Sequence, residues 1–281
     1  MNKVLELYTI STHAQADWNT LVTRQQCAYL DRKCLKTRKS APDVSIGTCT
    51  VNYGRGEPKP LIICPFRLLE RRQVFMDCLH LLTLHEPGNE LHIVQEVPIP
   101  GGSVDYFLVS AKARQVKDFV GLELQTLDTT GTVWPERQRF LQEQGLEVDT
   151  NISNSAKSFG MNWKITAKTT LMQLHHEAQT FEHLNKHLVL VIQDHLLNYM
   201  RRAFRFEHLN QARLGDPIHI HPYTLSPTES EFRLSLGSRF STDVAGIAEC
   251  LGLQANPKIE LREITRFLES KISDTTLLTV K

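Results

Sequence analysis

The sequence predicts an α/β protein with a central mixed sheet flanked by helices. Three observations support this: apolar residues recur at helical spacing over 66–83 and 164–185, three successive segments between 91 and 127 are strand-like, and a short apolar strand with a helix after it follows residue 187. The order helix, three strands, helix, strand, helix is typical of an α/β core. At 281 residues the chain allows one large domain or two small ones.

Composition excludes several classes of protein. With 41% hydrophobic and 22% charged residues, the chain resembles neither a long disordered segment nor a collagen-like or coiled-coil protein. No apolar run approaches the roughly 20 residues of a membrane span, and the first residues become polar too early for a secretory signal. We therefore expect a cytoplasmic protein with no membrane partner. The 32 basic and 31 acidic residues nearly cancel, so bulk charge alone does not indicate a polyanion ligand.

The first half of the chain predicts loops, one helix and three strands. Residues 40–63 are rich in proline and glycine, which favours loops and short strands. Pro65 stands at a favourable first position for a helix over 66–83. Strands are expected at 91–98, 103–110 and 119–127.

The second half begins with a loop-rich stretch at 128–160 and a helix over 164–185. That helix presents one apolar face: Leu171, Leu174, Ala178, Phe181 and Leu184. A strand over 188–192 and a helix through 196–204 follow. After residue 206 the pattern loosens, with a strand-like run at 232–236 and an amphipathic helix near 258–271. We expect three regions packed as one unit: an N-terminal region (1–65), a core (66–205) and a C-terminal accessory or recognition lobe (206–281).

Four of the six cysteines lie in one 38-residue stretch: Cys27, Cys34, Cys49 and Cys64. Without a secretory signal, disulfides are not expected. Reduced thiolates grouped in this way can hold one tetrahedral metal ion. The intervals of six, fourteen and fourteen residues contain no Cys-x-x-Cys pair, so the spacing equally allows buried thiols that act as small hydrophobic side chains.

Basic residues cluster beside the cysteines. The segment contains no acid over eight residues, and its basic members are Arg32, Lys33, Lys36, Arg38 and Lys39. Two further groups occur within 67–72 and 201–205. A solvated surface is the ordinary explanation of one such cluster, but three of them around a candidate active site favour a phosphate backbone as partner.

Three more polar residues stand at the start of the helix expected after the third strand. Asn162, Lys164 and Lys168 lie where a helix N-terminus attracts phosphate groups, although a solvated helix face is equally consistent with them.

Other motifs point to structure rather than to a site. His219-Ile-His221 and His175-His176 have no convincing partners for a metal ion. We expect Trp134 and Trp163 to pack in the core rather than to stack on nucleic-acid bases.

Acidic residues interrupt two successive apolar strands. Because strand side chains alternate in direction, Asp105 shares a face with Phe107 and Val109, whereas Val104 and Tyr106 face the other way. An acid in the middle of an apolar strand is costly to bury unless it is paired or binds a cation.

On the next strand Glu123 and Gln125 share a face. The two carboxylates, with the backbone carbonyl of Leu124, suit a divalent cation, and Glu96 on the preceding strand is a third candidate. Such a cation polarises a phosphodiester and lowers the pKa of its water nucleophile. The alternative is a pair of acids at a sheet edge exposed to water.

The order of these residues resembles a known family. The segment Glu96-Val-Pro-Ile-Pro-Gly-Gly-Ser-Val-Asp105, followed by Gly121-Leu-Glu-Leu-Gln125, resembles the core of the PD-(D/E)XK nucleases, with Gln125 where many members carry lysine. The Glu-x-Gln variant, continuing as Thr126-Leu-Asp-Thr-Thr-Gly131, is similar to the NotI-type restriction endonucleases.

Two flanking segments add to the resemblance. One is the cysteine-bearing stretch that closes with Cys49-Thr-Val and Ile62-Ile-Cys-Pro65, and the other is Gly160-Met-Asn-Trp-Lys-Ile-Thr-Ala-Lys168. Together the matching segments cover roughly residues 25–200.

The resemblance implies a restriction-endonuclease-like core with an N-terminal metal-binding subdomain built on four cysteines. Its catalytic residues are Glu96, Asp105, Glu123 and Gln125, with Mg²⁺ bound by Asp105, Glu123 and Leu124. The Gln125 amide carries no charge but can orient a water or a phosphate oxygen. The general base is then either a metal-bound hydroxide or a neighbouring phosphate of the substrate. The resemblance further implies a structural zinc or iron ion held by Cys27, Cys34, Cys49 and Cys64.

The expected function is that of a type II restriction endonuclease. It hydrolyses double-stranded DNA at a short palindromic site with Mg²⁺, as a homodimer, in a prokaryotic cytoplasm that also holds a cognate DNA methyltransferase. The basic segment from Arg32 to Lys39 is the candidate for contacts to base edges. Two alternatives stay open: a nuclease effector of another anti-phage or repair system, and a metal-stapled DNA-binding protein without catalysis. The intact set of four polar site residues argues against the second.

Overall fold

The computed structural model describes residues 3–54, 56–229, 231–253 and 261–271. Its largest feature is an eight-stranded sheet. The strands are β9 (Glu90–Ile99), β10 (Gly102–Lys112), β11 (Gln115–Gln125), β14 (His187–Gln193), β15 (Asn210–Gln211), β16 (Ile218–Pro227), β17 (Phe232–Leu236) and β18 (Phe240–Thr242). They follow the order β15-β18-β16-β14-β11-β10-β9, and β17 also pairs with β16. The central neighbours β11, β14 and β16 run parallel and the others antiparallel.

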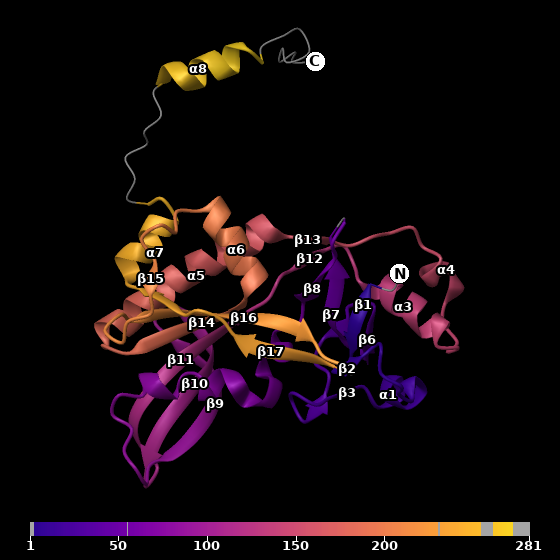
Figure 1. The fold of residues 1–281 in the computed structure, drawn as a ribbon, viewed down its shortest axis with the longest axis horizontal. Helices are drawn as coiled ribbons and strands as arrows, with labels where there is room; N and C mark the ends of the chain where they lie inside the picture. Colours follow the sequence, from indigo (N-terminus) through magenta and orange to yellow (C-terminus); the bar gives the residue numbers. More distant parts are fainter. Residues whose placement is uncertain (1–2, 55, 230, 254–260, 272–281) are drawn as a thin grey trace.

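Helices cover this sheet and connect its parallel strands. The described helices are α1 (Trp18–Arg24), η1 (Pro65–Arg72), α2 (Gln73–Met76), η2 (Leu79–Leu81), α3 (Trp134–Glu143), α4 (Thr150–Ser153), α5 (Trp163–His183), α6 (Asp194–Ala203), α7 (Val244–Cys250) and α8 (Leu261–Glu269). In Figure 1, α5, α6 and α7 lie together on one side of the sheet. Their apolar residues form one core with the sheet, whereas η1 and α2 pack against the other face. The expected α/β class with a mixed central sheet flanked by helices is confirmed.

The N-terminal region forms a smaller sheet. Its strands are β1 (Val4–Leu7), β2 (Ile10–Ser11), β7 (Thr48–Tyr53) and β8 (Lys59–Ile62), in the order β2-β1-β7-β8. Two hairpins lie between β1 and β7 in the chain: β3 (Gln26–Cys27) with β4 (Arg32–Lys33), and β5 (Thr37–Arg38) with β6 (Ala41–Ser45). A further short pair, β12 (Thr129–Thr130) with β13 (Gly160–Met161), closes the long connection between β11 and α5.

Most of the predicted elements between residues 91 and 204 are confirmed. The three strands, the long helix, the strand after it and the next helix all appear as β9, β10, β11, α5, β14 and α6. Leu171, Leu174, Ala178 and Phe181 are buried as expected, but Leu184, one residue beyond the end of α5, is half exposed.

One element prediction was wrong, and two helices were not predicted. The continuous helix expected over 66–83 is broken into η1, α2 and η2, because Glu70 is extended and Arg71 and Arg72 adopt left-handed conformations with φ of 51° and 56°. Within the stretch 128–160, expected to be loop-rich, the helices α3 and α4 were not predicted, and Trp134, Phe140 and Leu141 of α3 are buried.

The sheet continues beyond the expected core. Strand β16 pairs in parallel with β14, and its partners β17 and β18 also come from the C-terminal region. Strands β16, β17 and β18 are therefore part of the same sheet as β9–β11. The division into three regions and a role of the C-terminal lobe in recognition stay predictions. The helix expected near 258–271 appears as α8, while residues 258–260 lie outside the described residues. In the described part of the chain no helix is both long and apolar enough to span a membrane.

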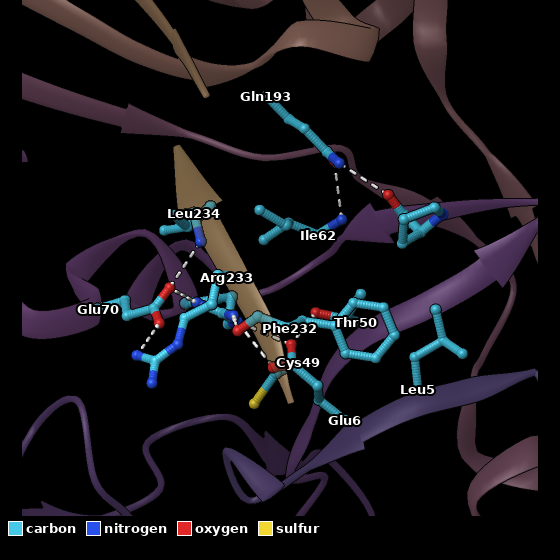
Figure 2. Close-up of polar contacts among 12 residues, drawn as sticks. Leu5, Glu6, Cys49, Thr50, Ile62, Glu70, Gln193, Phe232, Arg233 and Leu234 are labelled. Carbon is cyan, nitrogen blue, oxygen red and sulfur yellow. Dashed lines mark hydrogen bonds and ion pairs between the residues drawn. The ribbon is translucent and has the colours of Figure 1, made fainter. Parts of the chain in front are cut away.

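A buried arginine joins the two sheets. Arg67 of η1 has no exposed surface, and its Nε donates to Glu6 of β1 at 2.7 Å. Its two terminal nitrogens donate to Glu70 at 2.9 Å and to the backbone carbonyl of Phe232 on β17 at 2.8 Å. Glu70 also accepts from the backbone of Leu234, as Figure 2 shows. One guanidinium thus connects the first strand, the broken helix and the far hairpin of the main sheet.

We expect Arg67→Met to destabilise the fold by about 3–5 kcal/mol, because the buried Glu6 and Glu70 carboxylates would lose their counter-charge. The measurement is urea unfolding followed by circular dichroism. Arg233→Met is the matched control: Arg233 also contacts Glu70 but is partly exposed, so its loss costs about 1 kcal/mol or less. Equal losses for the two variants would contradict the central role of Arg67.

Two histidines of β16 are buried in the core. His219 is 1% and His221 0% exposed. His219 Nε2 lies 2.9 Å from the backbone oxygen of Asp216, and His221 Nδ1 lies 3.8 Å from Cys78 Sγ. Burial lowers the pKa of His219 to about 4 and that of His221 to about 3, with neighbouring cationic groups adding to the effect. Both rings are therefore neutral in the folded protein.

Acid should unfold the protein through these rings. In the unfolded chain a histidine binds a proton below pH about 6.5, whereas the folded rings resist protonation until much lower pH. The contribution of the two rings to the free energy of unfolding is therefore fully present above pH 6.5 and is lost below it, by up to about 1.4 kcal/mol per pH unit for each ring. The raised pKa values of Glu123 and Glu177 act in the opposite direction over the same range, so the contribution of a ring is read as the difference between the unaltered protein and a variant that lacks it. Urea unfolding between pH 7 and 4.5 measures this slope. His221→Gln should reduce the slope, and replacement of the exposed His13 should leave it unchanged.

Candidate active site

The two strand acids predicted from the sequence lie together where β10 and β11 stop pairing. The last backbone-paired residues at this end are Tyr106 and Leu122. Beyond them, side-chain carboxylates replace backbone carbonyls as acceptors between the strands. Leu124 N donates to Asp105 Oδ2 at 2.8 Å, and Asp105 N donates to Glu123 Oε1 at 3.2 Å. Each carboxylate therefore bridges to the backbone of the other strand, which fixes both acids on the α5 side of the sheet.

Helix α5 brings two further polar residues to these acids. Gln173 Nε2 donates to Glu123 Oε2 at 3.1 Å and to Glu177 Oε1 at 3.0 Å. Glu177 is fully buried, and within the described residues no N–H or O–H donor reaches its Oε2. A proton shared with another carboxyl group, a bound water or a cation would each satisfy that oxygen.

The sequence analysis missed Gln173 and Glu177. The signal was present, because Glu177 falls between Leu174 and Ala178 on the apolar face of the predicted helix. An acid on the apolar face of a helix, like an acid in an apolar strand, is costly to bury unless it is paired or binds a cation, and so it indicates a candidate site.

The loop before α5 places the helix. Asn162 N donates to the backbone oxygen of Asp128 at 2.8 Å, and Thr166 Oγ1 lies 3.3 Å from Asp128 Oδ2. The two ends of the connection between β11 and α5 therefore lie together, and α5 begins beside the end of β11. From there the helix runs back along the sheet and carries Gln173 and Glu177 past Glu123.

Burial and mutual repulsion govern the charge of the three acids. Burial raises the pKa of Glu123 to about 9, with the charges of Asp105 and Glu177 adding to the rise. Burial likewise raises the pKa of Glu177 to about 7, and that of Asp105 increases too. The site cannot hold three negative charges near neutral pH without a counter-charge. Carboxylates held in this state are suited to bind a cation or to share protons.

The remaining predicted catalytic residues border this group. Glu96 of β9 is exposed and has a left-handed φ of 52°, and it lies between the two β9 residues that pair with Val104 and Tyr106, so it is opposite Asp105. Its charge raises the pKa of Asp105. Gln125 lines a small cavity with Glu123 and Gln173, and its Nε2 donates to the backbone oxygen of Thr126 at 2.7 Å.

The predicted faces are largely confirmed. Phe107 and Val109 lie on the side of α5, and Tyr106 and Leu108 on the opposite side. Val104 was expected beside Tyr106 but packs in the core on the α5 side, at the place where the β9 pairing is interrupted by Glu96.

The four N-terminal cysteines are buried and neighbouring. Cys49 and Cys64 share a hydrogen bond that raises the pKa of Cys49, whereas the pKa of Cys64 falls to about 6 through that bond and the nearby Lys36 ammonium. Burial raises the pKa of Cys27, and Cys64 and Cys34 add to this rise. Over the described ranges, however, no three His, Cys, Asp or Glu side chains are arranged as metal ligands, neither here nor at the acids or at His219 and His221.

The predicted DNA-binding residues occupy two separate places. Arg32, Lys33, Lys36, Arg38 and Lys39 belong to the N-terminal hairpins, whereas Asn162, Lys164 and Lys168 stand at the start of α5. Lys33 and Lys36 donate to backbone oxygens, of Asp43 and Ile63 respectively.

The two tryptophans pack against other side chains. Arg38 lies 4.3 Å from the ring of Trp134, which is buried as expected. Trp163 is half-buried and packs against Tyr199 at 5.6 Å between ring centroids.

Comparison with known proteins adds no assignment, since no family model and no curated protein matches this chain.

We expect Gly102→Ala to disturb the site from the β9–β10 turn, because a Cβ at Gly102 would lie 2.7 Å from Glu177 Oε1. The displacement of a buried carboxyl should cost about 1–3 kcal/mol in the free energy of unfolding. Gly215→Ala is the control, since nothing lies within 4 Å of its added Cβ. Thermal unfolding of both variants measures the difference, and equal melting temperatures would show that the turn does not press on Glu177.

Proposed function

We propose that this chain is a Mg²⁺-dependent endonuclease that hydrolyses phosphodiester bonds of double-stranded DNA. The observation that carries the proposal is the group of three acids: Asp105 and Glu123 from adjacent strands and the buried Glu177 from α5. Their raised pKa values and the buried oxygen of Glu177 that meets no donor match a site built for a hard divalent cation. The resemblance of the sequence to NotI-type enzymes supports the more specific proposal of a type II restriction endonuclease.

Each residue of the acidic site has a separate role in the proposed reaction. Asp105 and Glu123 would hold the cation, with the Leu124 carbonyl as a further ligand, and Glu177 adds negative charge beside them. A bound Mg²⁺ polarises the phosphodiester and stabilises the leaving oxygen. Gln125 is placed to orient a water or a phosphate oxygen through its amide, and Gln173 fixes the Glu123 and Glu177 carboxyls relative to one another. Glu96, exposed opposite Asp105, is available to hold a second water.

The cysteine group supports the proposal of a structural zinc or iron ion. Four buried thiols from different segments of the N-terminal region form a soft donor set, and Cys64 is the thiol that loses its proton most readily. Holding these segments together would fix the β3–β4 and β5–β6 hairpins, which carry the basic residues proposed to contact DNA. We further propose a homodimer that cuts both strands of a palindrome and is paired with a DNA methyltransferase in a prokaryotic host.

The test is digestion of unmethylated phage DNA by the purified protein with Mg²⁺ or with EDTA, followed by end-sequencing of the products. Asp105→Asn and Glu123→Gln keep acceptors for the backbone N–H groups but remove charge, so we expect at least a ~10³-fold loss of cleavage rate with DNA binding retained. Glu90→Gln, an exposed acid on β9, should cut as the unaltered protein does.

Each pattern of products decides between the functions. Discrete Mg²⁺-dependent fragments with one shared palindrome at their ends support the restriction endonuclease, and a smear supports an effector nuclease with weak sequence choice. Intact DNA bound by a folded, metal-loaded protein would support the non-catalytic binder, and cleavage by Asp105→Asn at the rate of the unaltered protein would remove these acids from the mechanism.

A further inference from the structure

A second candidate site lies on the opposite face of the sheet. It is a cleft of about 620 Å³ between the β3–β4 turn, the end of η1, α2 and the strand pair β9–β10. Tyr106 and Gln95, which pair across the two strands, contribute to its wall. Because Tyr106 follows Asp105 directly and points to the other face, the cleft and the three acids share strand β10 but not a surface.

The cleft is positively charged. Arg32, Arg71 and Arg72 line it and are exposed, and none of the three forms an ion pair within the described residues. Asp31 is the single acid among the described lining residues. Unpaired guanidinium groups that converge on one cleft favour an anion with several oxygen acceptors, and phosphate matches their geometry.

The backbone that presents these arginines is held in an unfavourable conformation. Arg71 and Arg72 are consecutive left-handed residues, and Asp31 across the cleft has a φ of 51°. For residues with a Cβ this conformation is unfavourable and persists only where the surroundings enforce it, often at ligand sites. Here Glu70, directly before the pair, is fixed by Arg67, by Arg233 and by Leu234 N, as Figure 2 shows for the last two. The buried ion network therefore turns both arginines outward.

The walls also offer apolar and aromatic surface. The partly exposed Tyr29 borders the cleft, and the Phe75 and Tyr106 rings, 5.5 Å apart, also line it but are only 4% and 6% exposed, so the accessible surface is mainly that of Tyr29 and the aliphatic side chains. Leu91 and Ile93 of the edge strand β9 are 43% and 37% exposed beside them. A ligand that covers this surface and also meets three arginines has a flat apolar part and a phosphate part.

We propose that this cleft binds a nucleotide, with the base against the aromatic and aliphatic wall and the phosphate groups on Arg32, Arg71 and Arg72. The volume suits one nucleotide unit. The nucleotide is either free in solution or one unit of a nucleic-acid strand, and the two sources share the same chemistry. The site does not depend on the proposed cleavage, because its residues lie on the face of the sheet away from Asp105 and Glu123.

Two substitutions remove the charge without straining the backbone. In the double variant Arg71→Gly with Arg72→Gly, glycine adopts left-handed φ freely, so the turn is retained. The matched control is Arg114→Gly, because Arg114 has a left-handed φ of 63° in the β10–β11 turn and is exposed away from the cleft. Asp31→Asn acts in the opposite direction, since asparagine tolerates the same conformation and removes the acid of the cleft.

The protein is tested in buffer without added Mg²⁺ and without a chelator, which prevents cleavage and leaves the proposed structural metal ion of the cysteines in place. Equilibrium dialysis measures binding of radiolabelled dATP, and fluorescence anisotropy measures binding of a fluorescein-labelled DNA oligonucleotide. For a free nucleotide, dATP affinity falls at least about tenfold in the double glycine variant, rises several-fold in Asp31→Asn and is unchanged in Arg114→Gly. For a nucleotide within a strand, dATP does not bind and the same pattern appears with the oligonucleotide.

Two outcomes would overturn the proposal. In one, the double glycine variant binds dATP and the oligonucleotide as Arg114→Gly does, so the arginines of the cleft contact neither ligand. In the other, tripolyphosphate displaces the bound labelled ligand, dATP or oligonucleotide, as well as the same unlabelled ligand does, which would show a simple polyanion surface without a place for a base. Cleavage of DNA by the double variant in Mg²⁺ is recorded separately, so loss of the nucleotide site is distinguishable from loss of the nuclease function.

Discussion

The buried guanidinium of Arg67 is the constraint on which the rest of the fold depends. Two carboxylates and one backbone carbonyl, from three distant parts of the chain, meet at this buried group. The pKa of Glu6 is raised because burial outweighs the attraction of Arg67, whereas that of Glu70 is lowered because hydrogen bonds from Arg67, Leu234 and Arg233 outweigh burial. A buried charge without these partners would be strongly destabilising. The two sheets therefore have one compatible arrangement.

A second polar contact fixes the same junction from the other side. Gln193, at the end of β14, accepts from Ile62 N at 3.0 Å and donates to the Pro60 carbonyl at 2.7 Å (Figure 2). The side chain occupies the ladder position that a further strand would take beside β8. With Arg67 at one end and Gln193 at the other, the N-terminal sheet is held to the main sheet by groups that have no alternative partners among the described residues. This explains how a region with short strands and many turns keeps its cysteines and basic hairpins in defined positions.

Side-chain periodicity predicted the helices and strands in the middle of the chain correctly. It failed where contacts between distant residues determine the backbone conformation. Strands β9–β11 and helix α5 follow from side-chain periodicity, and the same periodicity placed Asp105 and Glu123 on one face. The helix expected over 66–83 failed because Glu70 binds Arg67, Arg233 and Leu234 N, and this geometry breaks the helix at Arg71. Glu177 was not predicted because one acid among Leu174, Ala178 and Phe181 leaves the apolar periodicity of α5 unchanged. Strand β16 was missed because its buried histidines made an apolar strand look polar.

The break in η1 and the cleft beside it have one cause, the ion network around Arg67. If residues 66–83 formed a straight helix, Arg71 and Arg72 would project from its regular faces, and no cleft would form against β9. The ion network favours the break, so the energy that stabilises the junction also maintains the left-handed pair of arginines. On the other face of the sheet, the repulsion among Asp105, Glu123 and Glu177 is maintained by burial and by Gln173. Strand β10 thus lies between an acidic site and a basic one, each kept in a state that a ligand of opposite charge would stabilise.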